Sequence, residues 1–179
     1  MSDPSDTQRL IGDAIRLGTI ETVDRAAATC TVRIGDLLTD EVPWLAFRAG
    51  GSCAWSPPTI GEQCLLLCPE GDTASGVVLL GLYSDANPAP SSADKLDLLR
   101  FADGAEISYD AVAHRLTAKL PAGGSATIDA PGGIELIGPV TITGKVTVSD
   151  DVVADGISLK SHVHAGVQSG GAKTLVPFK

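Results

Sequence analysis

The sequence predicts an all-β protein with two strand regions of different character. Over residues 18–83, short apolar runs alternate with turn residues such as glycine, proline and aspartate. From Gly132 onward a six-residue period appears, in which a turn residue is followed by alternating apolar positions. Both patterns are typical of strands, because alternation places one set of side chains on a single face.

A short amphipathic helix is predicted before these regions, over residues 5–18. Ser5 and Gln8 have the spacing of a capping box, and Gly18 supplies a stop. The residues that share one apolar face are Leu10, Ile11, Ala14 and Ile15.

Five strands are expected over residues 18–83, separated by turn-like sequences. They are 18–24, 28–35, 41–47, 62–70 and 76–84. Five short strands within about 65 residues are typical of a small closed or partly open barrel of the OB type.

All four cysteines and both tryptophans fall in this barrel region. The cysteines are Cys30, Cys53, Cys64 and Cys68. The close pair in "CLLLC" has the spacing of metal ligands, but its interior is apolar and no second close pair exists. We therefore interpret the cysteines as buried thiols in preference to a zinc site. Trp44 and Trp55 either form a ligand platform or pack in the core or a loop, and packing is the more common role.

A stretch rich in proline, serine and alanine, residues 84–94, predicts a linker. Residues 99–121 then predict one or two hairpin-like strands. His114 lies alone in this stretch, and we interpret it as an ordinary surface or strand histidine.

The six-residue repeat gives each unit one apolar face. The units begin at Gly132, Gly138, Gly144, Asp150 and Gly156. Their third and fifth positions in the first four units are Ile134, Leu136, Val140, Ile142, Val146, Val148, Val152 and Ala154. Each unit is thus expected to be a short strand closed by a turn residue.

Such hexads also occur in left-handed β-helices, the fold of many acyltransferases. Three hexads build each coil there, so five hexads give fewer than two coils, too few to bury an interior. If three identical chains wrap around one axis, each contributes one face and the apolar stripes close a shared core. The pattern therefore predicts an obligate trimer.

Two of the three histidines lie one residue apart in "SHVHAGVQSGG", residues 161–171. In a strand, His162 and His164 share a face, but two imidazoles are too few for zinc or for an octahedral ion. The pair is either incidental or completed by other chains. A trimer supplies six nitrogens, which suits an octahedral transition metal. Since Ile157 and Leu159 break the parity of the apolar series, the strand path must change between 155 and 162.

Composition excludes several classes of function. The net charge of −9 disfavours nucleic acid as a partner, and the presence of only two tryptophans, two tyrosines and three phenylalanines argues against a base-stacking platform. No apolar run reaches the roughly 18 residues of a membrane span, and no secretory signal opens the chain. The sequence contains no nucleophile elbow, metalloprotease or phosphate-loop motif, so no enzyme is predicted. An acyltransferase-like enzyme and an OB-type interaction module on a β-helical stalk remain the alternatives.

An OB-like N-terminal region, a hexad-repeating strand region and a terminal "SHVHAGVQSGG" together resemble the baseplate assembly protein V family. These proteins are the central spikes of contractile-tailed phages and related tail-like particles. The most specific part of the resemblance is "HVH" with a glycine-rich turn after the hexads.

This resemblance implies a homotrimeric needle at the tail tip, which pierces the host outer membrane during contraction. It implies one iron ion per trimer, held by His162 and His164 of each chain, and baseplate hub and tail tube proteins as partners. It further implies a place in the virion tail baseplate after assembly in the host bacterial cytoplasm. The expected domains are an N-terminal helix or arm (1–17), an OB-fold-like domain (18–83), a linker (84–94), a triple-stranded β-helix spike (95–160) and a metal-binding tip (161–179).

Overall fold

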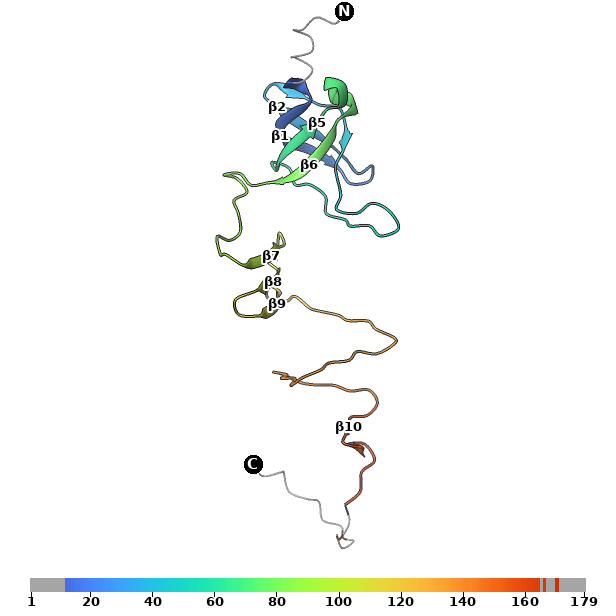
Figure 1. The fold of residues 1–179 in the computed structure, drawn as a ribbon. Coiled ribbons are helices and arrows are strands. Elements are labelled where there is room, and N and C mark those ends of the chain that lie inside the picture. The colour runs from blue at the N-terminus through green and yellow to red at the C-terminus, as the bar shows by residue number, and fades with distance from the viewer. Residues whose placement is uncertain (1–11, 165, 167–169, 171–179) are drawn as a thin grey trace, which may run out of the picture. The chain divides into compact units, whose positions relative to one another are not determined.

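The computed structural model describes residues 12–164, together with Gly166 and Gly170. Its regular elements are strands, joined by two single-turn 3-10 helices, η1 (Pro69–Gly71) and η2 (Thr73–Ser75). The chain divides into two compact units, Met1–Ala126 and Thr127–Lys179 (Figure 1). The prediction of an all-β protein is confirmed.

The first unit begins with a curled antiparallel sheet. Its strands are β1 (Ile15–Asp24), β2 (Thr29–Ile34), β3 (Leu37–Leu38), β4 (Val42–Pro43), β5 (Gln63–Leu67) and β6 (Val77–Leu82). They are ordered β3-β2-β1-β5-β6, and β4 also pairs with β2. A bridge between Trp44 and Val78 links the end of β4 to β6, where the Leu45 N–H donates to the Val78 carbonyl at 2.8 Å. The sheet therefore curls back on itself as a partly open barrel.

Alternate residues of these strands fill one core. The fully buried side chains are Ile20, Cys30, Val32, Val42, Cys64, Leu66, Cys68 and Val78. Trp44 and Leu80 pack against this cluster from its edge. The period of two read from the sequence thus corresponds to one buried face on each strand.

Two predictions for this region were wrong in their limits. Residues 5–11 of the predicted helix lie outside the described residues and residues 12 and 13 are helical, but Ile15 to Gly18 belong to β1, where Ile15 pairs with Leu67. Gly18 is not a helix stop: a Cβ there would meet Val32 Cγ1 and lie 3.0 Å from the Arg33 carbonyl oxygen. The strand expected over 41–47 is reduced to Val42–Pro43, because pairing with β2 ends there and Trp44 bridges Val78 of β6 instead.

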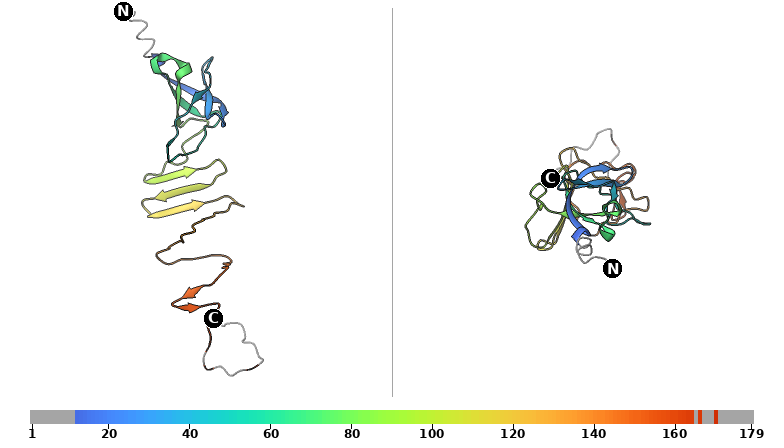
Figure 2. Two further views of the ribbon diagram at one scale, coloured as in Figure 1. Left: turned by 90° about the vertical axis from the view of Figure 1, so that its right-hand side faces the viewer. Right: turned by 90° about the horizontal axis from the view of Figure 1, so that it is seen from above.

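A three-stranded antiparallel meander follows in the same unit. It consists of β7 (Leu96–Arg100), β8 (Glu106–Asp110) and β9 (Arg115–Lys119), in the order β7-β8-β9 (Figure 2). In its register, Leu99 pairs with Ile107 and Tyr109 pairs with Leu116. Directly paired residues point to the same side, so these four apolar side chains share one face of the sheet. His114 lies in the β8–β9 turn, with φ +51°.

The second unit has few internal hydrogen bonds between strands. Its described strands are β10 (Val153–Ala154) and β11 (Ile157–Ser158), which pair with each other. The first three hexads, residues 132–149, form no strand within their own chain in the described structure, and the fourth contains β10. Gly138 and Gly144 have φ values of +127° and +131°, so the turn recurs after six residues as the repeat predicts.

The sequence predicted a change of strand path between 155 and 162, and the structure has this change at residues 155 and 156. Asp155 and Gly156 form the two-residue turn of the β10–β11 hairpin, with φ +49° and +79°. Positive φ at both positions is the type I′ arrangement, for which Asp-Gly is a preferred sequence. This turn reverses the chain and explains why Ile157 breaks the parity of the earlier apolar positions.

Candidate metal centre

His162 and His164 follow β11 and lie beside each other. Their ring centroids are 5.0 Å apart and the rings meet edge to face, at 83°. Both side chains are exposed and line an open groove with Gly156, Ile157 and Ser158. The spacing of two residues therefore brings the two imidazoles together.

The hydrogen bonds of His162 determine which of its ring nitrogens is free. Its Nδ1 lies 3.0 Å from the Ser158 carbonyl oxygen. A carbonyl only accepts, so Nδ1 must carry the proton and donate. In the neutral imidazole Nε2 then has an unshared electron pair, which is the state that binds a metal.

Ser158 is the centre of the loop that leads to the histidines. Its Oγ accepts the Ser161 N–H at 2.9 Å, and its carbonyl accepts the His162 N–H at 3.1 Å. The Asp151 carboxylate accepts the Lys160 N–H at 3.1 Å and the Val152 N–H at 2.8 Å. A hydrogen bond from the Ser158 side chain to this carboxylate is the main cause of the lowered pKa of Asp151.

Ser158 and Asp151 were not predicted from the sequence as residues of this site. The spacing of Ser158 and Ser161 is that of a serine whose side chain accepts a backbone N–H three residues later, which is a recognisable turn signal. Nothing in the sequence pattern linked Asp151 to this turn, because the contact depends on the β10–β11 hairpin.

One chain supplies too few ligands for a metal. Among the residues that the structure describes, no three His, Cys, Asp or Glu side chains are grouped so as to hold an ion. The two imidazoles of one chain can contribute two nitrogens, whereas six-coordinate transition metals need six. If this is a metal site, other copies of the chain must complete it.

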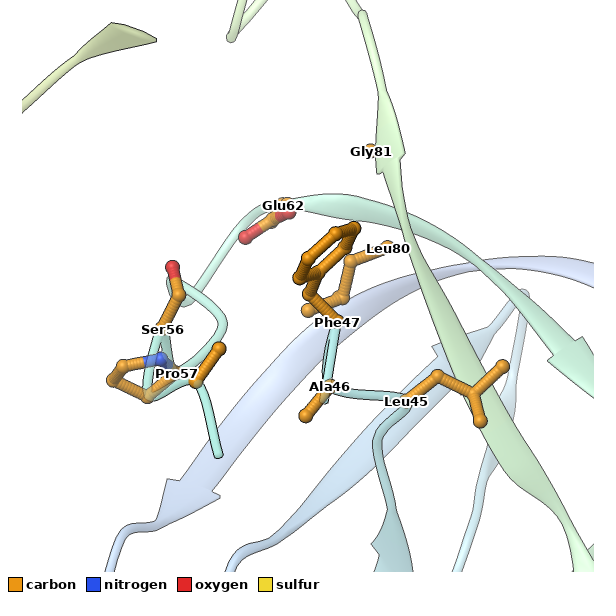
Figure 3. Close-up of a pocket in the computed structure, with 9 residues that line it drawn as sticks. Leu45, Ala46, Phe47, Ser56, Pro57, Glu62, Leu80 and Gly81 are labelled. Carbon is orange, nitrogen blue, oxygen red and sulfur yellow. The ribbon is translucent and has the colours of Figure 1, made fainter. Parts of the chain in front are cut away.

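The barrel carries an apolar groove without catalytic groups. Figure 3 shows the Phe47 ring beside Leu80 and Glu62, with Pro57 on the other side of the groove. Glu62 is the one ionisable side chain among the lining residues, so the groove offers no acid–base pair. Phe47 is 93% exposed.

The cysteines and tryptophans of the barrel have mainly packing roles. Cys30, Cys64 and Cys68 are buried, as expected, but Cys53 is exposed in the loop after Phe47, contrary to the prediction. Burial raises the pKa of Cys30 and of Cys64 to about 11, which keeps both as neutral thiols. Trp44 packs against the core and its ring centroid lies 5.8 Å from that of Trp55.

In the described part of the chain, no helix has the length and apolar character needed to cross a membrane.

Comparison with known proteins gives two family matches and one curated relative. Residues 16–83 match the Type VI secretion system/phage-baseplate injector OB domain, which confirms the predicted OB type. Residues 156–177, which include both histidines, match the GpV Apex motif. The spike protein of Escherichia phage P2 is 42% identical over 130 residues, which cover 69% of this chain and 61% of that relative. The chain therefore spans less than two thirds of the relative's length.

Proposed function

Because this chain belongs to the phage baseplate assembly protein V family, by its OB domain and its apex motif, we propose that it forms the central spike of a contractile tail. In this proposal three copies wind together, and the resulting needle pierces the host outer membrane when the tail contracts. The observation that carries the proposal is the row of apolar side chains that remains uncovered along the hexads of a single chain.

That apolar row is too regular to belong to a solvated tail. The seven larger members of the third and fifth positions have exposed fractions between 42% at Val152 and 69% at Leu136. Together with Ala154, they occupy the same two positions in each of four successive units. Exposed apolar surface on this scale is a mark of an interface. The first three hexads also leave their backbone N–H and C=O groups without strand partners in the described chain. Neighbouring chains would cover the apolar row and pair with this backbone at once.

The meander supports the same assembly independently. Its face with Leu99, Ile107, Tyr109 and Leu116 is uncovered, and Leu116 is 73% exposed. The opposite face is mixed and less exposed: it carries Leu96 and Leu98 beside the ion pair between Arg100 and Glu106 at 2.7 Å. A sheet face with four exposed large apolar side chains needs a cover. Three such sheets around one axis would cover each other.

A metal at the tip fits the chemistry of the two histidines. His162 has Nε2 free for a ligand bond, and three chains would bring six imidazoles together. The bound ion would cross-link the chains at the narrow end, where little apolar area is available to hold them. The family resemblance favours iron, although nickel or copper binds such nitrogen sites more tightly and metal supply would decide the outcome.

The proposed function is mechanical and involves no substrate. The partners would be the baseplate hub and tail tube proteins, and the site of action the tail tip of the virion, after assembly in the host bacterial cytoplasm. An interwound trimer suits this role, because axial load is then shared by hydrogen-bonded strands of three chains.

Sedimentation equilibrium at micromolar concentration tests the assembly. The proposal requires a mass of about 55 kDa, three times the 18.3 kDa of one chain. A stable monomer would contradict it and would favour an OB-type interaction module, for which the exposed Phe47 groove is the observation in support.

Metal analysis tests the tip. Protein purified without chelator should contain one transition-metal ion per three chains. The double variant His162→Ala/His164→Ala should remain trimeric and contain no stoichiometric metal, whereas His114→Ala should keep the metal. One ion per chain, or metal retained by the double variant, would contradict the shared site.

A further inference from the structure

A chain of hydrogen bonds connects the β10–β11 hairpin to the ring of His162. We propose that Asp151 and Ser158 are positioning residues, which fix the tautomer and the orientation of His162 so that Nε2 is presented to a metal. This inference rests on the proposed metal-binding tip and names two residues of this chain that lie outside the histidine pair.

The first step joins the two strands of the hairpin. Asp151 precedes β10, and its Oδ1 accepts the N–H of Lys160, which lies beyond β11, at 3.1 Å. The same oxygen accepts the Val152 N–H at 2.8 Å, and the Ser158 side chain also bonds to this carboxylate. One carboxylate therefore holds both ends of the hairpin, where β10 and β11 themselves contribute only two residue pairs.

The second step orders the loop after β11. The Ser158 hydroxyl accepts from the Ser161 N–H at 2.9 Å and from the Ser161 hydroxyl at 2.8 Å. These contacts turn residues 158–162 so that the Ser158 carbonyl faces back toward His162. It then accepts both the backbone N–H of His162, at 3.1 Å, and its ring Nδ1–H, at 3.0 Å.

Hydrogen bonds matter here because burial does not fix the ring. Ser161, His162 and His164 are all exposed in the single chain. Metal-binding histidines usually donate their second ring N–H to a carbonyl or carboxylate, and loss of that partner weakens metal binding. The ring of His164 packs edge to face against that of His162, so a displaced His162 ring would also displace the His164 ring.

The tautomer can be measured in the unaltered protein. The chain has three histidines, so selective ¹⁵N labelling of histidine gives few signals, and His114 serves as an internal reference. In the full chain stripped of metal with a chelator, long-range ¹H–¹⁵N spectra above pH 8 should show His162 protonated at Nδ1. A His162 signal with the proton at Nε2 would overturn the inference, whatever the metal content of the protein.

The second experiment compares two adjacent aspartates. Asp151→Ala removes the carboxylate that holds the hairpin, whereas Asp150→Ala removes the same charge from a side chain that is 92% exposed and whose partner, Lys160 Nζ, lies 3.5 Å away. With Ni²⁺ alone as the probe, Asp151→Ala should lower the affinity of the trimer about 10- to 100-fold, and Asp150→Ala should leave it unchanged. Asp151→Asn keeps an acceptor oxygen and should restore part of the loss.

Ser158 gives a matched pair of variants. Ser158→Ala removes the hydroxyl but keeps the carbonyl, and should weaken Ni²⁺ binding, whereas Ser158→Thr keeps the hydroxyl and should rescue it. The visible absorption of bound Co²⁺ should shift in Ser158→Ala and not in Ser158→Thr, because the ligand geometry changes only in the former. Equal affinities and spectra in all variants would refute the positioning role. Failure of the unaltered trimer to bind Ni²⁺ would instead refute the proposed metal tip.

Discussion

At Gly18, strand β2 approaches β1 so closely that no side chain fits. A Cβ there would meet Val32 Cγ1 and lie 3.1 Å from Ile34 Cγ1, and both neighbours belong to β2. Gly18→Ala should therefore lower the free energy of unfolding of the barrel by about 1–3 kcal/mol, through overpacking. Tryptophan fluorescence during denaturant unfolding measures this, since both tryptophans lie in the barrel. Gly50→Ala, with no atom within 4 Å of the added carbon, should change little, and an equal loss in both variants would disprove the close approach.

The four thiols should differ sharply in reactivity. Cys53 is exposed, whereas Cys30, Cys64 and Cys68 are buried and have raised pKa values. Because the thiolate is the reactive form, a disulfide reagent at pH 8 should label one thiol per folded chain and four per unfolded chain. Cys53→Ser should abolish the fast reaction. Rapid labelling of two or more thiols in the folded protein would contradict the buried assignment.

The same thiols give the barrel a pH dependence. Burial raises the pKa of Cys30 and Cys64 from 9.0 to about 11, so between these values the folded chain binds more protons than the unfolded chain. The free energy of unfolding must then fall as the pH rises from about 9 to about 11. Cys30→Ala should flatten this fall relative to the unaltered protein, and identical slopes would contradict the assignment.

At the scale of elements, the strands of the barrel could be predicted because their pattern has a local cause. Each of β1, β2, β5 and β6 alternates buried and exposed side chains against a core within its own chain. The limits of β1 could not be predicted, since Ile15 has helical spacing with Ile11 and is drawn into a strand only by pairing with β5. The histidine pair was visible from its spacing. Asp151 was not, because its role depends on a turn that brings Lys160 back beside it.

The apolar face of the hexads has no covering partner in the described part of its own chain. The sequence predicted a strand in every hexad, and in the described single chain the first three hexads form no ladder. If the third and fifth positions face a shared axis, Val146→Asp places three carboxylates together without partners, at a cost of several kcal/mol. We expect this variant to sediment as a monomer or as a trimer open over residues 127–164. Thr147→Asp, on the opposite face, should assemble normally. A heat-resistant trimer of the Val146 variant would show that the inward assignment is wrong.

At the scale of the whole molecule, the two units differ in what stabilises each of them internally. The first has its own core of eight buried side chains, all between Ile20 and Val78. The second has no buried side chain among its described residues, and its apolar groups lie in one repeating row. A unit of the first kind can fold alone, whereas a unit of the second kind can fold only as it associates.

Refolding should therefore occur in two processes, one with a rate independent of protein concentration and one with a rate that depends on it. Trp44 and Trp55 both report on the first unit, so the recovery of tryptophan fluorescence should proceed at a rate independent of protein concentration. Protease resistance of residues 127–164 should instead recover faster as the concentration rises, because that unit gains its core only from other chains. The His162→Ala/His164→Ala variant should show the same concentration dependence, since the apolar row is unchanged. If protease resistance returned at the same rate at every concentration, each chain would be folding its hexads alone, and the shared core would have to be abandoned.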